Sequence, residues 1–252
     1  MYQQILAAQQ NSQAVAVCTV IRTHGSTPRR AGTKMLVYAD GSFAGTIGGG
    51  EMEARVLAAA QQALMDGQTR ILAYNFTDPT RGDPGVCGGQ MEVFVEPILP
   101  EATVVVIGAG HVGKAVIHLA KWLGLRVIVS DDRAEFCTPE AAPGADLYLP
   151  VPLAELPQHL NIHRQTYLVL TTRGSSVDVA GLPALLNTPA AYIGIIGSRR
   201  RWETTRKALL ESGIPEDALS RVHSPMGIEI HAETPEEIAV SILAQIIALY
   251  RG

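Results

Sequence analysis

A glycine-rich segment between an apolar run and a helical pattern limits the possible folds of this chain more than any other segment. The run Val104–Ile107 leads into Gly108, Gly110 and Gly113, which have the spacing G-x-G-x-x-G. Glycines at these positions allow a tight turn and close packing between a strand and the following helix. A helical pattern follows over residues 112–123, and β-branched residues at 126–130 predict another strand. The segment therefore predicts a unit of strand, helix and parallel strand.

The same alternation continues to the end of the chain. Apolar runs at 167–170 and 192–196 alternate with helical segments at 182–186 and 202–210. This order predicts a mainly parallel sheet with helices on both faces, which is a Rossmann-like fold. Thr234, Pro235 and Glu237 have the pattern of an N-cap, a first-turn proline and a capping box, so we expect a packed terminal helix after them.

The first hundred residues predict a separate domain of mixed α/β type. Apolar runs at 14–21 and 35–38, an Ala-rich helix at 51–64 and an alternating strand at 91–98 are its elements. Pro97 and Pro100 then suggest a linker. We expect an N-terminal mixed α/β domain over residues 1–99 and a Rossmann-like parallel-sheet domain over residues 100–252, and 252 residues suit two domains.

Composition argues against several classes of protein. The net charge is -4 and the isoelectric point is near 6.0, so no global field favours nucleic acid. No run approaches ~18 uninterrupted apolar residues, and the N-terminus lacks the pattern of a signal peptide, so we expect a cytoplasmic protein without a membrane span. The three cysteines are widely spaced and predict neither a disulfide framework nor a structural zinc site. The metal ligands, if any exist, are unknown from the sequence.

The glycine segment lies between a predicted strand and a predicted helix, as in dinucleotide-binding sites. Gly108 allows the turn, Gly110 lets the backbone approach a pyrophosphate at the helix N-terminus, and Gly113 allows close helix packing. Asp131 ends the second strand, where a carboxylate would accept hydrogen bonds from an unphosphorylated ribose. His111 lies inside the turn and is a candidate ligand contact. We expect NAD or another dinucleotide here, and the alternative is a Rossmann sheet that binds no nucleotide.

Three arginines follow the strand at 192–196. Arg199, Arg200 and Arg201 stand at a predicted helix start, where cations oppose the helix dipole. A bound anion would remove this conflict, and the carboxyl edge of the sheet would place the cluster at the same crevice as the glycine loop. We expect Arg199 to assist anion binding. The alternative is that the guanidinium groups point into water.

Two segments of the N-terminal half have the composition of a phosphate site. Arg29, Arg30 and Lys34 gather cations among small residues, and the triple glycine Gly48, Gly49 and Gly50 opens a helix with bare backbone N–H groups. Tight turns between short strands would explain the glycines but would leave the cations unused.

Cys87 lies among glycines in a predicted loop, next to Gly85, Gly88 and Gly89. A thiol in such a place can be reached by a ligand and can act as a soft metal ligand or sulfur nucleophile. Cys18 lies in an apolar run and is expected to be buried. The alternative is that Cys87 is inert.

Taken together, these segments resemble the XdhC/CoxI family of xanthine dehydrogenase accessory proteins, and the resemblance spans nearly the whole chain. It rests on the segments 25–29, 45–50, 87–89, 108–111, 131–133, 192–194, 196–199 and 225–228, continued by 239–242. The family implies binding of the molybdenum cofactor (molybdopterin), protection of this cofactor during sulfuration by a cysteine desulfurase, and delivery to an apo molybdenum hydroxylase of the xanthine dehydrogenase type. On this resemblance Cys87 is the candidate cofactor or sulfur contact, and Arg29 with Gly48–Gly50 are candidate pterin-phosphate contacts.

Two departures from the family pattern limit what is carried over. Many members have T-H-x-H-x-x-D where this chain has residues 172–178, with Arg173 and Ser175 in place of the histidines and with Asp178 retained. Many members also have a cysteine directly after the triple glycine, where this chain has Glu51. A role for the histidines and a two-cysteine mechanism are therefore not expected here.

Two other functions remain open. The glycine loop and Asp131 are compatible with an NAD(P)-dependent oxidoreductase, although no Tyr-x-x-x-Lys pair for hydride-transfer chemistry is evident. A nucleotide-sensing regulatory protein would need the Rossmann half alone and would leave the Cys87 loop unexplained. We expect a chaperone rather than a turnover enzyme, and a homodimer as its oligomeric state.

Overall fold

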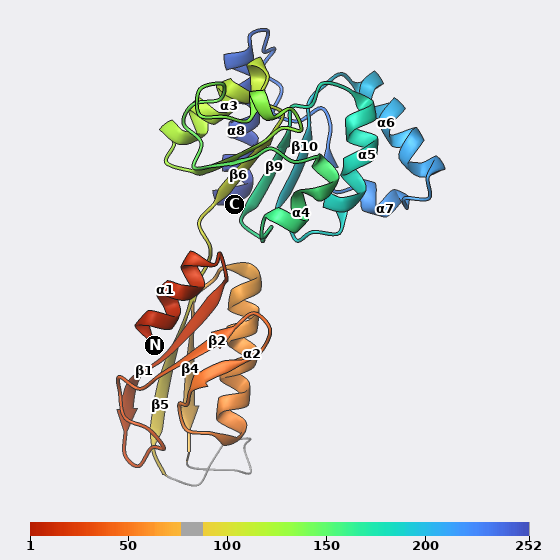
Figure 1. The fold of residues 1–252 in the computed structure, drawn as a ribbon. Coiled ribbons are helices and arrows are strands. Elements are labelled where there is room, and N and C mark those ends of the chain that lie inside the picture. The colour runs from red at the N-terminus through yellow and green to blue at the C-terminus, as the bar shows by residue number, and fades with distance from the viewer. Residues whose placement is uncertain (77–87, 252) are drawn as a thin grey trace. The chain divides into compact units, whose positions relative to one another are not determined.

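The computed structural model describes residues 1–76 and 88–251. The chain divides into two compact units, Met1–Pro100 and Glu101–Gly252 (Figure 1). The first unit has an antiparallel sheet with helices, and the second has a parallel sheet with helices. The mixed α/β fold with a Rossmann-like second domain is thus confirmed.

The N-terminal unit is built on a five-stranded sheet. Its strands are β1 Val15–His24, β2 Lys34–Tyr38, β3 Phe43–Gly45, β4 Arg70–Asn75 and β5 Gln90–Ile98. They lie in the order β3-β2-β1-β5-β4, and every neighbouring pair is antiparallel. The expected strands at 14–21, 35–38 and 91–98 are all present.

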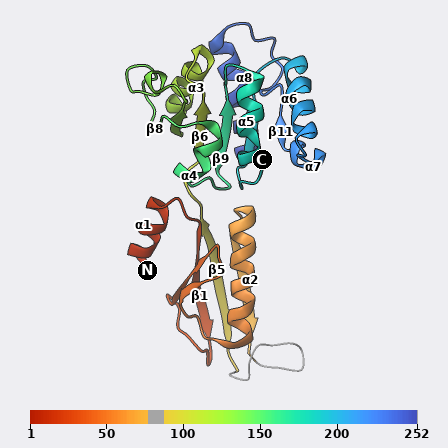
Figure 2. The same ribbon diagram turned by 45° about the vertical axis from the view of Figure 1, so that its right-hand side comes forward.

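Two helices cover opposite faces of this sheet. The long helix α2 Gly50–Asp66 packs Met52, Val56 and Ala60 against buried side chains of β1, β2 and β5. The short helix α1 Tyr2–Gln10 packs Ala8 against Val15 and nearby residues of the other face. Figure 2 shows α1 and α2 on the two sides of the sheet.

The C-terminal unit has a six-stranded sheet in which every strand pair is parallel. Its strands are β6 Thr103–Ile107, β7 Arg126–Ser130, β8 Leu147–Leu149, β9 Thr166–Leu170, β10 Tyr192–Ile195 and β11 Val222–His223. The order β11-β10-β9-β6-β7-β8 places the first strand of the unit in the middle. The chain therefore winds first to one side of β6 and then to the other, which is the doubly wound Rossmann order.

Helices cover both faces of the parallel sheet (Figure 1). Alternate residues of β6 point to opposite faces: Val104 and Val106 pack with α3 His111–Trp122 and α8 Pro235–Arg251, whereas Val105 and Ile107 pack with the other set of helices. The helices of that second set are α4 Leu156–His159, α5 Ser175–Leu186, α6 Arg199–Glu211 and α7 Glu216–Leu219. Two single 3-10 turns, η2 Ala134–Phe136 and η3 Leu153–Glu155, lie in the connections.

The structure differs from the expectation at α5 and confirms it at α8. Helix α5 begins at Ser175, seven residues before the expected segment, because small polar residues and Asp178 occupy its first turn and conceal the helical pattern. The capping box of α8 is formed, since Glu237 N–H donates to Thr234 Oγ1 at 3.2 Å and its carboxylate accepts from Thr234 N–H at 3.1 Å. Across the described part of the chain, no helix has both the length and the apolarity needed to span a membrane.

Candidate functional site

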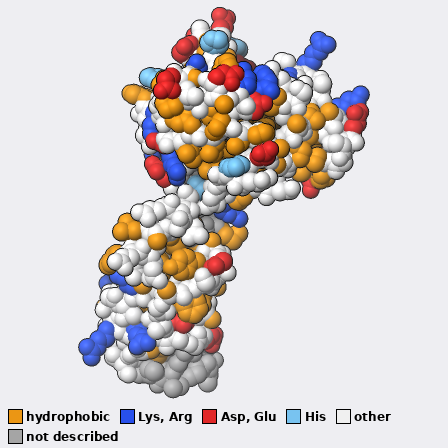
Figure 3. All heavy atoms as spheres, in the orientation of Figure 1, with side chains coloured by type: hydrophobic (Ala, Val, Ile, Leu, Met, Phe, Trp, Pro, Cys, Tyr) orange, Lys and Arg blue, Asp and Glu red, His pale blue; other side chains and the backbone are white. Residues whose placement is uncertain are grey.

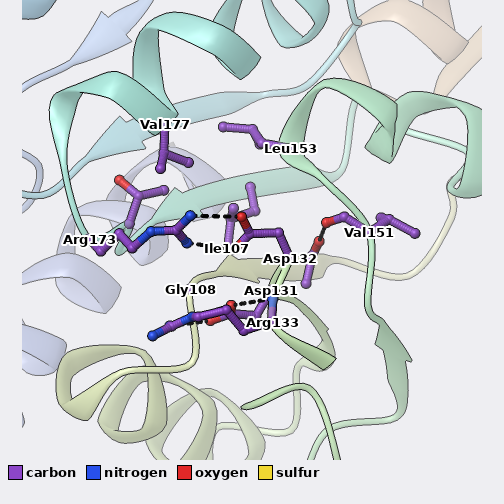
Figure 4. A pocket seen from close by; sticks show the side chains of 11 residues that line it. Ile107, Gly108, Asp131, Asp132, Arg133, Val151, Leu153, Arg173 and Val177 are labelled. Atoms are coloured by element: carbon purple, nitrogen blue, oxygen red, sulfur yellow. Dashed lines mark hydrogen bonds and ion pairs between the residues drawn. The ribbon is translucent and has the colours of Figure 1, made fainter. Parts of the chain in front are cut away.

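The carboxyl ends of β6, β7 and β9 meet at the point where the winding of the parallel sheet reverses. Ligands of open α/β sheets bind in the crevice at this edge. The glycine loop after β6, the segment Asp131–Arg133 after β7 and the turn at Thr172 after β9 all line one pocket there (Figure 4). The expected glycine and Asp131 positions are therefore brought together by the fold.

The three glycines of the loop after β6 differ in whether the structure leaves room for a side chain there. Gly108 has φ +104°, and a Cβ there would lie 2.6 Å from the carbonyl oxygen of Thr171. A Cβ on Gly113 would lie 2.1 Å from the carbonyl oxygen of Gly108, so this position lets α3 approach the turn. A Cβ on Gly110 would meet no atom within 4 Å. Two of the glycines are therefore needed for packing, and Gly110 faces open space.

Asp131 holds the glycine loop in place. Its Oδ2 accepts the backbone N–H of Ala109 at 2.9 Å and Arg133 Nη2 at 2.8 Å. Its Oδ1 accepts the backbone N–H and the Nε of Arg133 at 3.0 and 2.9 Å. Burial alone would raise the pKa of the Asp131 carboxyl, but these hydrogen bonds outweigh burial and lower that pKa. The expected ribose acceptor is thus already bonded within the protein.

A second carboxylate and a second arginine cross the pocket. Arg173, on the turn after β9, donates Nη1 to Asp132 Oδ1 at 2.6 Å and Nη2 to Asp132 Oδ2 at 2.8 Å. The hydrogen bonds of this guanidinium lower the pKa of the Asp132 carboxyl. Sequence reasoning noted Arg173 as a departure from the family pattern but gave neither residue a role. The adjacent acids Asp131 and Asp132 at a strand end were the signal that could have found the pair.

The arginine cluster at the start of α6 divides into one structural residue and two exposed ones. Arg201 donates Nη2 to Asp178 Oδ2 at 2.7 Å and to Thr172 Oγ1 at 2.7 Å, and so ties α6 to the turn after β9. Arg199 and Arg200 are exposed, and the side chain of Arg199 forms no hydrogen bond or ion pair with the part of the chain that the structure describes. The prediction that Arg199 binds an anion stays a prediction. His111 is also exposed, at the first position of α3.

Glycines from three separate segments meet at one end of the N-terminal unit. A Cβ on Gly89 would lie 2.1 Å from the carbonyl oxygen of Ser26, and one on Gly25 would lie 3.2 Å from the carbonyl oxygen of Gly88. A Cβ on Gly48 would lie 2.8 Å from Pro28 Cγ. The loops after β1 and before α2 therefore touch, and the loop after β1 also touches the segment that precedes β5.

The triple-glycine loop does not offer bare N–H groups at all its positions, contrary to the sequence expectation. Glu53 Oε2 accepts from Thr46 Oγ1 at 2.5 Å and from the N–H groups of Ile47 and Gly49 at 3.0 and 3.3 Å. Gly48 N–H donates to Thr46 Oγ1 at 3.2 Å. Of the three glycine N–H groups that an anion was expected to take, the one of Gly49 is thus bonded to Glu53, which lies one turn into the helix that the loop opens, and the one of Gly48 is bonded to Thr46.

The fold separates the three cations that the sequence placed in one phosphate site. Arg29 and Arg30 are exposed on the loop after Pro28. Lys34 instead begins β2, opposite Thr19 of β1, and donates Nζ to Thr19 Oγ1 at 2.8 Å. The strand starts one residue earlier than expected, so Lys34 belongs to the sheet and not to the loop cluster.

Two of the three cysteines, Cys18 and Cys137, lie among the described residues, and both are buried. Cys87, the expected reactive thiol, lies outside the described residues 1–76 and 88–251, as does Gly85. Cys18 is fully buried, and this burial raises the pKa of its thiol to about 12. Burial also raises the pKa of the Cys137 thiol, which donates to the carbonyl oxygen of Val129 at 3.5 Å. Among the described residues no group of three His, Cys, Asp or Glu side chains could hold a metal ion.

Surface charge is mixed on the face of the C-terminal unit that Figure 3 shows, where acidic and basic side chains are interspersed. This agrees with the small net charge of -4. The expectation of no nucleic-acid partner stays a prediction.

Comparison with known proteins finds relatives among curated proteins and among solved structures. The chain is 36% identical over 237 residues to the uncharacterized protein YqeB of Escherichia coli, covering 92% of this chain and 43% of that protein. It is 32% identical over 155 residues to a probable xanthine dehydrogenase subunit of Bacillus subtilis, covering 62% of this chain and 45% of that protein. The chain thus spans less than half the length of either relative.

A crystal structure of a xanthine dehydrogenase from Bacillus halodurans has the same fold. It is 23% identical, has a TM-score of 0.53, and the match covers 99% of this chain and 95% of that one. The family described as the XdhC Rossmann domain matches residues 104–246, more than half of the chain, and the family described as XdhC and CoxI matches residues 8–75. This chain therefore belongs to the XdhC and CoxI family.

Proposed function

We propose that this protein binds the molybdenum cofactor and delivers it to an apo molybdenum hydroxylase of the xanthine dehydrogenase type. The family and the name of the Bacillus subtilis relative support an accessory role toward xanthine dehydrogenase. The observation that carries the binding role is the meeting of three glycine-containing segments at one end of the N-terminal unit. Small residues there let a ligand approach the backbone closely.

Open space and exposed cations accompany this meeting of glycines. Among the described residues, a Cβ on Gly49, Gly50 or Gly88 would meet no atom within 4 Å. Arg29 and Arg30 are exposed on the loop whose Pro28 touches Gly48. The cofactor carries a phosphate group, and guanidinium groups bind phosphate through paired hydrogen bonds. We assign the phosphate to these arginines and the pterin to the glycine surface beside them.

The sulfur chemistry is assigned to Cys87. The described cysteines, Cys18 and Cys137, are buried with raised pKa values, so neither presents a thiolate at neutral pH. Under this proposal the protein shields the cofactor while a cysteine desulfurase supplies sulfur, and it acts as a homodimer. Cys87 would then contact the molybdenum or the incoming sulfur.

The test is reconstitution of an apo-hydroxylase. The full chain is loaded with molybdenum cofactor, bound molybdenum is measured by mass spectrometry, and recovery of hydroxylase activity is followed. The double variant Arg29→Ala/Arg30→Ala is expected to lose at least tenfold in cofactor affinity, whereas Arg200→Ala, an exposed arginine of the other unit, is the matched control. If wild-type protein binds no cofactor, or if the double variant and the control bind it equally well, the proposal fails.

A further inference from the structure

We propose that the pocket at the carboxyl edge of the parallel sheet binds the adenosine half of a dinucleotide with a free 2′-hydroxyl, and that Asp132 and Arg173 read its ribose. Asp131, the acid that the sequence pattern favours for this task, is instead a positioning residue for the glycine loop. This inference concerns the C-terminal unit alone and does not depend on the proposed handling of the molybdenum cofactor.

The acceptors of Asp131 are fully used inside the protein. A carboxylate offers about four lone-pair sites, two on each oxygen. Oδ1 accepts the N–H and the Nε of Arg133, and Oδ2 accepts the N–H of Ala109 and Arg133 Nη2. The Asp131 side chain is only 2% exposed. A ribose hydroxyl would find no free acceptor on this carboxylate.

Arg133 is held in place as well, so it does not simply swing away to release Asp131. Its guanidinium carbon lies 3.8 Å from the centre of the Phe136 ring, a cation–π contact that adds to the salt bridge with Asp131. The hydrogen bond from Ala109 to Asp131 then fixes the turn between Gly108 and Gly110. The pair of Asp131 and Arg133 therefore shapes the loop on which a pyrophosphate would lie.

Asp132 has free hydrogen-bond acceptor sites, whereas those of Asp131 are all occupied. Each of its oxygens accepts one hydrogen bond from Arg173 and keeps a second lone pair. Its side chain is 34% exposed and lines the pocket. Figure 4 shows the Asp132–Arg173 pair between Val177 and the Asp131–Arg133 pair. Asp132 can accept two ribose hydroxyls while it remains paired with Arg173.

The wall beside this pair is suited to a flat base. Ile107, Val151, Leu153 and Val177 line the pocket with apolar side chains. The two hydroxyls of the lining are engaged: Ser130 Oγ donates to the carbonyl oxygen of Val151 at 3.4 Å, and Thr172 Oγ1 donates to Asp178. The wall thus offers apolar contacts to the faces of a base, which is adenine in the proposed dinucleotide, and does not read its polar edge.

The phosphates would lie next to the adenosine, over Gly110. This glycine opens toward free space at the N-terminus of the twelve-residue helix α3, and no side chain caps that helix end. Unpaired backbone N–H groups at a helix N-terminus favour a pyrophosphate. The pocket and the glycine loop share Gly108, so one dinucleotide can occupy both.

The charges of the pocket favour an unphosphorylated ribose. Two carboxylates and two guanidinium groups line it, and they are paired with one another. A 2′-phosphate would add negative charge beside Asp132 and would compete with that carboxylate for Arg173. Hydroxyl groups cause neither conflict. The site is therefore expected to prefer NAD⁺ over NADP⁺.

The experiment is calorimetric titration of the full chain with NAD⁺ and, separately, with NADP⁺. Wild-type protein is expected to bind NAD⁺ at least tenfold more tightly. Asp132→Asn is expected to weaken NAD⁺ binding at least fivefold and to leave NADP⁺ binding within twofold, so the preference shrinks. Asp131→Asn is expected to weaken both ligands by the same factor, because it loosens the loop that both share.

Asp146→Asn is the matched control. Asp146 also forms an ion pair, with Lys121, but it accepts the N–H of Val127 at the opposite, amino end of the sheet. The Asp146→Asn variant should bind NAD⁺ and NADP⁺ with the affinities of the wild type. Circular dichroism checks that every variant is folded. The inference is overturned if wild-type protein binds neither dinucleotide, if it binds NADP⁺ as tightly as NAD⁺, or if Asp131→Asn abolishes the preference while Asp132→Asn keeps it.

Discussion

Asp178 and Arg201 form a salt bridge of 2.7 Å in which the carboxylate side chain is completely buried and the arginine side chain is 22% exposed. The same guanidinium donates to Thr172 Oγ1, and Thr172 also donates to Asp178. These three side chains tie the starts of α5 and α6 to the turn after β9. Arg173, which crosses the pocket to Asp132, is the residue after Thr172 in that turn.

Removing Asp178 should therefore destabilise the C-terminal unit. Asp178→Ala leaves a largely buried guanidinium without its partner, and breaking a buried pair in this way costs about 3 kcal/mol. Both tryptophans, Trp122 and Trp202, lie in this unit, so the shift is measured as urea unfolding followed by tryptophan fluorescence. Glu211→Ala is the control, because its exposed pair with Lys207 has a separation of 3.9 Å and should contribute less than about 0.5 kcal/mol. Equal stability of Asp178→Ala and the control would contradict the assigned role.

The same substitution at two glycines of one loop should destabilise the protein to very different extents. Gly113→Ala places a Cβ 2.1 Å from a backbone oxygen, so the strand-helix turn must open and the midpoint of thermal unfolding should fall by more than about 5 °C. Gly110→Ala meets no atom within 4 Å, and should cost less than about 1 kcal/mol, mainly as a poorer N-cap. Dinucleotide binding should be lost in both. A stable Gly113→Ala protein would show that the loop packs differently.

Glu53 should make the N-terminal unit sensitive to acid. Burial would raise the pKa of this carboxyl, but hydrogen bonds from Thr46, Ile47 and Gly49 outweigh it and lower the pKa below the ordinary value of 4.5. The stabilisation is thus present above pH 4.5 and is lost as the pH falls through the lower pKa of the folded state. Glu53→Ala should cost about 2 kcal/mol at pH 7, and its difference from wild type should shrink below pH 4.5.

Circular dichroism measures this change, since the tryptophans lie in the other unit. Glu51→Ala is the matched control, because Glu51 is exposed and, among residues 1–76 and 88–251, forms an ion pair only with Arg55 one turn along α2. This variant should change stability by less than about 0.5 kcal/mol. A difference between Glu53→Ala and wild type that stays constant from pH 7 to pH 3 would contradict the assignment.

Thiol alkylation should separate Cys87 from the other two cysteines. Cys18 is fully buried and the pKa of its thiol is raised to about 12, and Cys137 is 5% exposed with a raised pKa. Iodoacetamide at pH 8 should therefore modify neither in the folded protein, since the thiolate is the reactive form. Mass spectrometry should show at most one adduct, on Cys87, and three adducts after denaturation. An adduct on Cys18 or Cys137 without denaturant would refute this account.

Local signals in the sequence were sufficient to predict the fold class and most strands of the parallel sheet. Five β-branched or apolar residues in a row, as in Thr103–Ile107, predict a strand that is buried on both faces of its sheet. The glycines that follow this strand predict a tight turn into a helix. The terminal helix α8 could also be predicted, because its N-cap, proline and capping glutamate are local signals in the sequence. The first turns of helix α5 and the edge strand β4 were missed, because their patterns of exposed and buried residues are set by their neighbours.

Which side chains are free to act depends on contacts that form only in the folded protein. Asp131 and Asp132 are adjacent and chemically identical, yet one is saturated by Ala109 and Arg133 and the other keeps free acceptors toward a pocket. Among three consecutive arginines, Arg201 is internal and Arg199 is exposed. Likewise, Glu53 accepts the Gly49 N–H, which the triple glycine was expected to leave open. Hydrogen-bond capacity is consumed by partners up to dozens of residues away in the chain, and local sequence does not encode that pairing.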